Sequence, residues 1–324
     1  MAAIQFYQYS SKSTYETNTS SRTGSLNVTM KDLKRYAVSV GGFHTWPVSA
    51  LGVRFYEALL EMTVTEGTQF SIRDDYRKAE SSIKTALSFF MGMIAAKAMA
   101  EKEYLIPYLF HLKDPALHAV TSGKTPDFFG LKNRKTALLM ESKGTVRSRP
   151  SKEVITHAKD QLDAVGSVEV TIGKTKKTYL KGNLEGHVIA SGFQKNNMTY
   201  YDVDPEPKGE NTLKINLDRE IVEYYRPVMM ILQAHPTQTQ FFGNEPFMIA
   251  ETKSGQLGLR QEIYELFTGR NFCFSKKPNR AEKKAYPQAE GLYQRLAEIA
   301  ERYRPMVDYM QPEISMGLDG ILLK

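Results

Sequence analysis

A long apolar segment limits the folds that this chain can adopt. Residues Ala86–Ala100 form the longest apolar run in the sequence, and the charge of Lys97 interrupts it. A membrane-spanning helix needs about 20 consecutive apolar residues, so this run is too short to cross a bilayer. The surrounding segment Glu80–Tyr104 has a helical pattern that is apolar on most sides. We therefore expect a helix that the rest of the protein buries from several directions.

The composition is that of a globular protein. Hydrophobic residues make up 41% and charged residues 24% of the 324 residues, which excludes a disordered or collagen-like chain. The net charge of +7 is compatible with a polyanionic partner but does not require one. The single cysteine, Cys273, excludes a disulfide framework and a cysteine-based structural zinc site. The first 25 residues lack the apolar region of a signal peptide, so we expect a soluble, cytoplasmic protein with no membrane partner.

Helical and strand-like patterns alternate in the middle third of the chain. This alternation predicts an α/β fold in which helices flank both faces of a mixed central sheet. The helix over Ser151–Val165 has a clear start, because Ser151 can cap its first turn and follows the helix-breaking Pro150. The expected elements, in chain order, are a helix at Glu80–Tyr104, strands at Leu105–Leu112, Asp127–Leu131 and Thr136–Met140, the helix at Ser151–Val165, a basic turn or hairpin at Gly173–Lys181, and strands at Gly186–Phe193 and Met198–Val203.

The sequence suggests three regions. Residues 1–79 are expected to begin with a flexible stretch rich in Ser and Thr and to continue with a helix at Ala50–Thr63. Residues 80–205 form the α/β core, which ends near the proline- and glycine-containing segment 204–211. Residues 206–324 are expected to be mostly helical, with helices at Asp218–Gln233, Gln261–Thr268 and Glu290–Tyr303, a strand at Pro246–Ala250, and a basic loop at Ser275–Lys284.

Two acidic residues and a lysine stand at the ends of neighbouring expected strands. Asp127 begins one strand, and Glu141 and Lys143 follow the four apolar residues of the next. Side chains alternate across a strand, so positions 141 and 143 point to the same side. A hairpin would bring Asp127 beside Glu141, and two carboxylates there would repel each other unless a cation lay between them. Oxygen ligands of this kind suit Mg²⁺ or Mn²⁺.

This arrangement resembles the PD-(D/E)xK phosphodiesterase superfamily, which has a restriction-endonuclease-like fold. The resemblance covers residues 80–205 and is carried by Pro126-Asp127 and by Glu141-x-Lys143 after an apolar strand. It implies that Asp127 and Glu141 bind a divalent metal, that the backbone carbonyl of Ser142 completes the coordination, and that Lys143 acts on the attacking water. It also implies an acidic residue on the preceding helix, for which Glu80 and Glu101 are the candidates.

The Glu-x-Lys pattern has little specificity by itself, because it occurs four times in the sequence, at Glu141, Glu206, Glu251 and Glu282. Only Glu141 and Glu251 follow a strand-like apolar run, and the dipeptide Pro-Asp occurs once, 14 residues before Glu141. The alternative interpretation is a surface Glu–Lys pair at a strand end, with Asp127 capping a turn. For Glu251 and Lys253 a solvated strand end is the expectation.

Further candidate residues lie on the helix and loops that follow. Helical geometry places Gln161 on the stripe that faces the sheet, where a glutamine reaches the active site in some nuclease relatives; the alternative is a place at the margin of that stripe. Basic residues after the site and in the C-terminal basic loop are candidates for binding a phosphate backbone, or for simple solvation. These candidates are Arg147, Arg149, Lys152, Lys276, Lys277 and Arg280.

These observations predict a Mg²⁺-dependent endodeoxyribonuclease, with Mn²⁺ as an alternative to Mg²⁺ and RNA as an alternative to DNA. An endonuclease is favoured because many exonuclease relatives carry Gln-x-x-x-Tyr, and Val165 stands in place of that tyrosine. The resemblance implies a restriction or anti-phage defence role, as a homodimer or with a partner protein. Two other hypotheses remain: a catalytically inactive nucleic-acid-binding or assembly subunit on the same fold, and a protein–protein scaffold.

Overall fold

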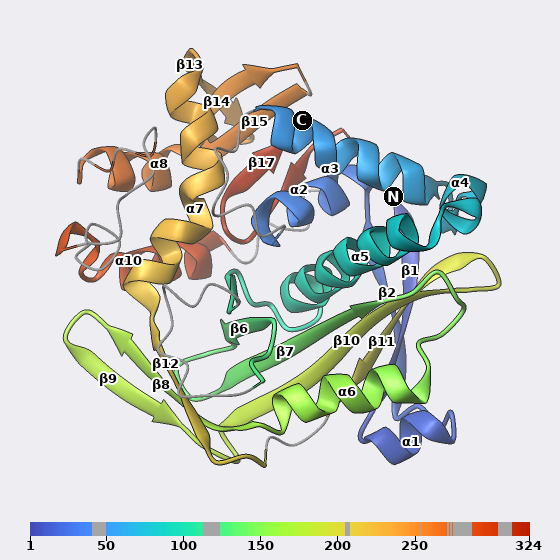
Figure 1. Ribbon diagram of the computed structural model, residues 1–324. Coiled ribbons are helices and arrows are strands. Elements are labelled where there is room, and N and C mark those ends of the chain that lie inside the picture. The colour runs from blue at the N-terminus through green and yellow to red at the C-terminus, as the bar shows by residue number, and fades with distance from the viewer. Residues whose placement is uncertain are drawn as a thin grey trace.

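A mixed β-sheet with helices on both faces forms the centre of the molecule (Figure 1). Nine of the described strands belong to this sheet, and two smaller sheets contain three and five strands. The predicted α/β class with a mixed, helix-flanked sheet is therefore confirmed. The computed structural model describes residues 1–40, 50–112, 124–204, 208–253, 255–270, 272, 274, 287–303 and 313–324.

The central sheet joins strands that are far apart in the chain. Strand β7 pairs antiparallel with β6 and parallel with β10, and β10 pairs antiparallel with β11. In spatial order the sheet contains β2 (Arg22–Val28), β1 (Ala2–Tyr9), β11 (Asn197–Val203), β10 (Leu184–Gln194), β7 (Ala137–Gly144), β6 (Phe128–Leu131) and β5 (Leu109–His111), and a short hairpin of β3 (Val64–Glu66) and β4 (Phe70–Ile72) pairs with β11.

The start of the chain differs from the expectation of a flexible stretch. Strand β1 lies inside the central sheet, between β2 and β11. The side chains of Ala2, Ile4 and Phe6 are at most 1% exposed, because alternate positions of the strand face the core. Ser11 is the N-cap of the short helix α1 (Lys12–Glu16), and its side chain accepts a hydrogen bond from the Thr14 backbone in a capping box.

Helices α5 and α6 cover opposite faces of strand β7. Helix α5 (Ser81–Lys102) approaches so closely that a Cβ atom at Gly144 would lie 1.8 Å from the Ser88 carbonyl oxygen. Lys143, whose side chain points to the other face, contacts Gln161 of α6 (Lys152–Leu162) instead. Helices α2 (Met30–Val40), α3 (Ala50–Thr63) and α4 (Asp74–Lys78) lie on the α5 side (Figure 1).

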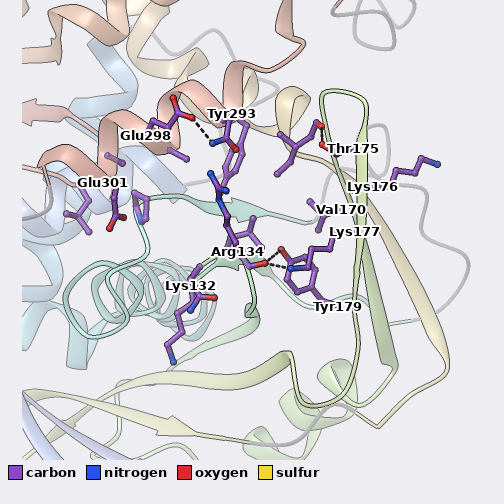
Figure 2. Close-up of a pocket in the computed structure, with 18 residues that line it drawn as sticks. Lys132, Arg134, Val170, Thr175, Lys176, Lys177, Tyr179, Tyr293, Glu298 and Glu301 are labelled. Carbon is purple, nitrogen blue, oxygen red and sulfur yellow. Dashed lines mark hydrogen bonds between the residues drawn. The ribbon is translucent and has the colours of Figure 1, made fainter.

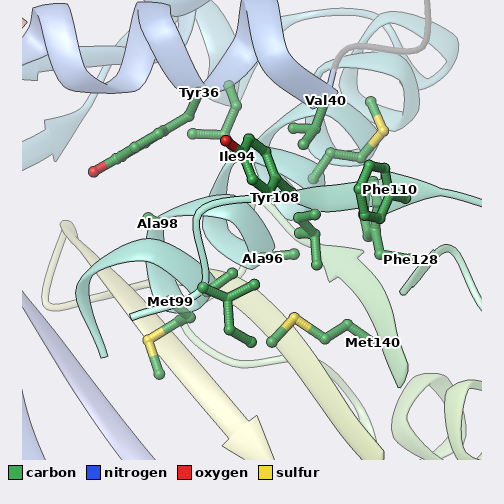
Figure 3. Packing of buried hydrophobic residues seen from close by; sticks show 14 of the residues in the cluster. Tyr36, Val40, Ile94, Ala96, Ala98, Met99, Tyr108, Phe110, Phe128 and Met140 are labelled. Atoms are coloured by element: carbon green, nitrogen blue, oxygen red, sulfur yellow. The ribbon is translucent and has the colours of Figure 1, made fainter. Parts of the chain in front are cut away.

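The predicted buried helix is confirmed. Residues Ala95–Ala100 of α5, Lys97 included, have no exposed surface. Figure 3 shows Ile94, Ala96 and Ala98 of this helix among Tyr108 and Phe110 and other core side chains. By length and composition α5 could cross a membrane, but 67% of its most apolar 18-residue stretch is buried inside the protein.

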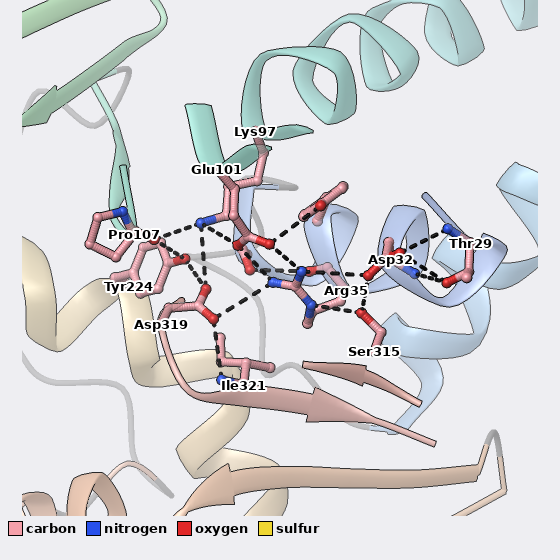
Figure 4. Close-up of polar contacts among 12 residues, drawn as sticks. Thr29, Asp32, Arg35, Lys97, Glu101, Pro107, Tyr224, Ser315, Asp319 and Ile321 are labelled. Carbon is pink, nitrogen blue, oxygen red and sulfur yellow. Dashed lines mark hydrogen bonds and ion pairs between the residues drawn. The ribbon is translucent and has the colours of Figure 1, made fainter. Parts of the chain in front are cut away.

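A network of buried charges surrounds Lys97 and Arg35 (Figure 4). The Arg35 guanidinium donates to both carboxylate oxygens of Glu101, at 2.9 and 2.5 Å, and its Nε donates to Ser315 Oγ at 2.8 Å. The Lys97 ammonium donates to the Pro107 carbonyl at 2.6 Å and lies 3.5 Å from Asp319. Buried charges are tolerated when they are paired and hydrogen-bonded in this way.

The C-terminal region contains more strands than expected. Strand β12 (Asn211–Asn216) returns to pair with β8 (Val165–Ile172), which also pairs with β9 (Thr175–Tyr179) and so confirms the expected basic hairpin. The five-stranded sheet contains, in spatial order, β13 (Thr237–Phe242), β14 (Glu245–Thr252), β15 (Gly255–Arg260), β17 (Ile321–Leu323) and β16 (Ser315–Met316). Helices α7 (Leu217–Ala234) and α8 (Gln261–Thr268) pack on β14 and β15, and the 3₁₀ turn at Pro287–Ala289 and α10 (Leu292–Tyr303) pack on α7.

One buried cluster of hydrophobic residues includes members from all three predicted regions, from Ala2 to Leu323. The expected basic loop at 275–284 lies outside the described residues. Helix α6 is shorter than expected: it ends at Leu162, and Val165 begins strand β8 instead of completing the helical stripe. The cap at Ser151 is confirmed, since its side chain accepts a hydrogen bond from the Val154 backbone.

Candidate active site

Four of the predicted site residues meet at the carboxyl end of strand β7. Lys143 Nζ lies 2.5 Å from Glu141 Oε1 and 3.3 Å from Gln161 Oε1. The Gln161 amide in turn donates to the Thr125 carbonyl, at 3.4 Å, two residues before Asp127. The alternation of side chains along β7 and the packing of α6 on that face produce this arrangement.

The two carboxylates brace the hairpin between β6 and β7. Asp127 Oδ2 accepts hydrogen bonds from the Ser142 backbone N–H at 2.9 Å and from Ser142 Oγ at 2.7 Å. The Asp127 backbone N–H donates to Glu141 Oε2 at 3.0 Å. The antiparallel pairing of Phe128 with Met140 sets the two acidic residues beside each other. The two carboxylates are therefore held in fixed positions before any ligand arrives.

The site combines buried acids with a partly exposed amine. Asp127 is 4% and Glu141 1% exposed, whereas 26% of the Lys143 side chain is exposed. The Lys143 ammonium supplies the positive charge that a buried carboxylate needs. The alternative interpretation of a surface Glu–Lys pair is therefore wrong for Glu141, and Asp127 bonds Ser142 across the two strands instead of capping a turn.

The donor set fits Mg²⁺ in one specific way. Among the residues that the structure describes, no three or more His, Cys, Asp or Glu side chains form a group that could hold a metal. Mg²⁺ does not need such a cage, because it usually keeps several waters and is bound by one or two carboxylates together with substrate phosphate. The carboxylates of Asp127 and Glu141 are hard oxygen donors of the required kind, and Ser142, whose carbonyl is the third expected ligand, directly follows Glu141 in the chain.

Neither candidate for a further acidic ligand contributes to this site. The Glu80 carboxylate caps α5 by accepting a hydrogen bond from the Ser82 backbone. Glu101 belongs to the buried network with Arg35. Both acids are therefore engaged on α5 away from Glu141.

The predicted phosphate-binding residues differ in their surroundings. Arg147 and Lys152 are exposed, on the segment after β7 and at the start of α6. Arg149 is half-buried, and its guanidinium lies 3.7 Å from the centre of the Tyr15 ring. Lys276, Lys277 and Arg280 lie outside the described residues. Arg149 therefore has a packing role that the sequence did not indicate, while Arg147 and Lys152 are accessible to solvent.

A group of tyrosines around Arg149 was not identified from the sequence. Tyr7 and Tyr9 of β1, Tyr15 of α1 and Tyr201 of β11 contact one another through their rings. The only local sign was the presence of three tyrosines in an otherwise polar start. The fourth comes from almost 200 residues later, so only the parallel pairing of β1 with β11 brings it there.

A large cavity lies away from the carboxylates. It has a volume of about 860 Å³ and is bounded by the β6–β7 turn, the β8–β9 hairpin and α10 (Figure 2). Lys132 and Lys176 on its wall already pair with Glu185 and Glu169, at 3.2 and 3.6 Å. Since β6 and β7 join there, this cavity is at the opposite end of β7 from Lys143.

The second strand-end Glu-x-Lys pattern, at Glu251 and Lys253, ends β14 with both residues exposed, as expected. Glu206 and Glu282 lie outside the described residues.

Comparisons of the chain with family models, curated proteins and solved structures found no match. The functional interpretation therefore depends on the geometry of the site itself.

Proposed function

We propose that this chain is a metal-dependent nuclease that hydrolyses DNA phosphodiester bonds. The observation that supports this proposal is the meeting of Asp127, Glu141, Lys143 and Gln161 at one strand end. Two carboxylates on neighbouring strands, an amine that contacts one of them and an amide that contacts the amine form the kind of constellation that is found in active sites.

The order of elements supports the same proposal. Helix α5, the meander β5–β6–β7, helix α6 and the parallel strand β10 occur in the order expected for a restriction-endonuclease-like core, with the β8–β9 hairpin inserted between α6 and β10. The crossover from β7 through α6 to β10 places α6 over the face that carries Lys143. We therefore infer that the middle of the chain is such a core, in the PD-(D/E)xK superfamily.

Each residue has a distinct role in the proposal. Asp127 and Glu141, with the Ser142 carbonyl, would hold a Mg²⁺ or Mn²⁺ ion, which would polarise the phosphate and lower the pKa of a bound water. Lys143 orients the attacking water and stabilises negative charge on the phosphate. Gln161 holds the Lys143 ammonium in place through its amide oxygen.

Supercoiled plasmid incubated with the protein and Mg²⁺, Mn²⁺ or EDTA tests the proposal. We expect nicking or cleavage with either metal and none with EDTA. Glu141→Gln and Lys143→Met should each lower the rate by about 100-fold or more, as removal of one electrostatic catalytic group does. The matched controls are Glu251→Gln and Lys253→Met, which alter the same pattern at the exposed end of β14. If the β7 variants cut as well as these controls, the site assignment is wrong.

A second candidate is a catalytically inactive nucleic-acid-binding or assembly subunit on the same fold. The ion pair between Lys143 and Glu141 favours it, since that pair already neutralises one carboxylate. This candidate predicts DNA binding that weakens with salt, needs no divalent ion and survives Glu141→Gln. A restriction or anti-phage role in the cytoplasm, as a homodimer or with a partner protein, is part of our proposal and comes from the family resemblance.

A further inference from the structure

A small aromatic hollow lies beside the segment that follows the candidate active site. Its volume is about 180 Å³, and it is lined chiefly by Tyr7, Tyr9, Tyr201, Arg149, Asn18 and Gln194. Tyr9 and Tyr201 are buried, Tyr7 is half-buried, and Asn18 and Gln194 are exposed at the rim. We call this feature the tyrosine hollow.

Arg149 gives the tyrosine hollow a fixed positive charge. Its guanidinium lies 3.7 Å from the centre of the Tyr15 ring and 5.4 Å from that of Tyr9. One terminal nitrogen donates to Asn18 Oδ1 at 3.0 Å and the other to the Tyr15 carbonyl. Its Nε is buried and has no hydrogen-bond partner within the described structure. The guanidinium is therefore held in place beside the ring-lined space.

The register of the central sheet links the tyrosine hollow to the candidate active site. Lys143 on β7 pairs with Ala190 on β10, Ala190 pairs with Tyr201 on β11, and Tyr201 pairs with Tyr7 on β1. Residues paired in this way point to the same face of a sheet. At about 4.8 Å per strand, Tyr201 and Tyr7 stand ~10 and ~14 Å from Lys143 along that face. The exposed Arg147 lies on the chain segment between Lys143 and Arg149.

The chemistry of the tyrosine hollow suits a nucleobase. Its described lining residues include no acid and combine aromatic rings, an arginine and two side-chain amides. Tyr9 and Tyr201 are 2% and 3% exposed, whereas Tyr7 is half-buried, so Tyr7 is the ring that a base can reach. Unpaired bases stack on aromatic rings and on arginine planes, and amides hydrogen-bond their edges. In a duplex the bases are already stacked and paired, so they are not available to such a site.

We infer that the tyrosine hollow binds one unpaired base of a single-stranded polynucleotide whose scissile phosphate lies at Asp127, Glu141 and Lys143. This inference rests on the proposed nuclease function. At the ~3.4 Å spacing of a stacked strand, a separation of ~10 to ~14 Å corresponds to about three to four nucleotides. The substrate class is then single-stranded or locally opened DNA rather than a continuous duplex.

Fluorescence anisotropy of a labelled DNA single strand and of its duplex, both in EDTA, tests this inference without cleavage. We expect tighter binding of the single strand. Tyr7→Leu should weaken single-strand binding by about 10-fold, the loss typical of one base–aromatic stack, and should leave duplex binding unchanged. Tyr7→Phe keeps the ring and should bind as the wild type does. Tyr264→Leu, at a half-buried tyrosine of α8, is the matched control.

A second measurement separates this inference from the proposed function. An abasic position is moved along a single-stranded substrate, and cleavage with Mg²⁺ is followed. The wild type should cut more slowly when the abasic position is about three to four nucleotides from the cleaved bond. The cleavage rate of Tyr7→Leu should not depend on where the abasic position lies. If DNA is cut but Tyr7→Leu binds and cuts like wild type, the base site is refuted and the nuclease stands. If Tyr7→Leu loses single-strand binding and no metal supports cutting, the base site stands and the nuclease fails.

Discussion

His187 is buried in a polar cluster where β10, β11 and the end of α5 meet. Its Nδ1 lies 2.9 Å from Asp202 Oδ1 and 3.1 Å from the Tyr104 hydroxyl, and its Nε2 lies 3.6 Å from Glu185. Burial alone lowers the pKa of the imidazole, but the charge and hydrogen bond of Asp202, together with Glu185, outweigh it and raise that pKa to about 10. The histidine is therefore packed and charged in the folded protein.

This cluster predicts a pH dependence of stability. A histidine with a raised pKa in the folded state contributes its full stabilisation below the unfolded value of ~6.5 and loses it as the pH rises toward about 10. The difference in unfolding free energy between wild type and His187→Gln should therefore shrink above about pH 6.5, by up to ~1.4 kcal/mol per pH unit. Urea unfolding across this range measures it, with the exposed His157→Gln as control. A difference that stays constant with pH would contradict this account.

At the level of single residues, the sequence predicted the site better than its surroundings. Positions 141 and 143 are two apart on a strand and so point to the same side, and Gln161 lies on the helix stripe that faces the sheet. Both are local properties of the sequence, and the structure brings these side chains together. The ring contact of Arg149 with Tyr15 joins residues that are 134 apart in the chain. No local pattern encodes such a contact, so a basic loop was all that the sequence could indicate.

The close crossing of α5 over β7 depends on two glycines, which have no side chain. A Cβ atom at Gly92 would lie 2.7 Å from the Lys143 carbonyl carbon, and one at Gly144 would lie 1.8 Å from the Ser88 carbonyl oxygen. Backbone atoms cannot rotate away as a flexible side chain does. These two glycines therefore set the distance between the helix and the strand that carries the site.

Gly144→Ala should push α5 away from β7. Overpacking of this kind costs about 1–3 kcal/mol of unfolding free energy, and a backbone clash belongs at the upper end of that range. Urea unfolding measures the loss. The control is Gly67→Ala, where the nearest atom to the new Cβ would be the Gln69 carbonyl oxygen at an ordinary 3.5 Å. Equal stability of the two variants would show that the helix moves freely on the strand.

Elements with a strong local pattern were predicted accurately. The ranges Ala50–Thr63 and Gln261–Thr268 are the observed α3 and α8, because helical spacing of apolar residues is visible within one element. Strands β1, β12 and β16 were not predicted. Pairing with β11, with β8 and with β17 defines them, and β16 has only two residues, too few to show alternation.

At the scale of the molecule, the buried charge network joins four parts of the chain. Arg35 comes from α2, Lys97 and Glu101 from α5, and Tyr224 from α7, and Asp319 precedes β17. Each of these charged side chains has a partner of opposite sign, so the removal of one leaves another uncompensated in a medium of low polarity. The network therefore fixes the C-terminal hairpin against the central helix.

Lys97→Met should lower the unfolding free energy by about 3–5 kcal/mol, because it removes one partner from a buried ion pair. The control is Lys78→Met, whose ion pair with Asp74 is exposed and should contribute less than about 1 kcal/mol. Chemical denaturation of both variants, followed by circular dichroism, makes the comparison. Similar small losses in both would mean that water reaches the network around Lys97.

Strand β1 occupies an interior place in the sheet, yet its parallel neighbour is synthesised almost 200 residues later. A ribosome that adds ~5–20 residues per second needs about 10–40 s to cover that gap. Throughout this interval strand β1 has no β11 to pair with, and its apolar residues Ile4 and Phe6 are exposed on the nascent chain. The yield of native protein should therefore depend on chaperones that protect this strand during translation.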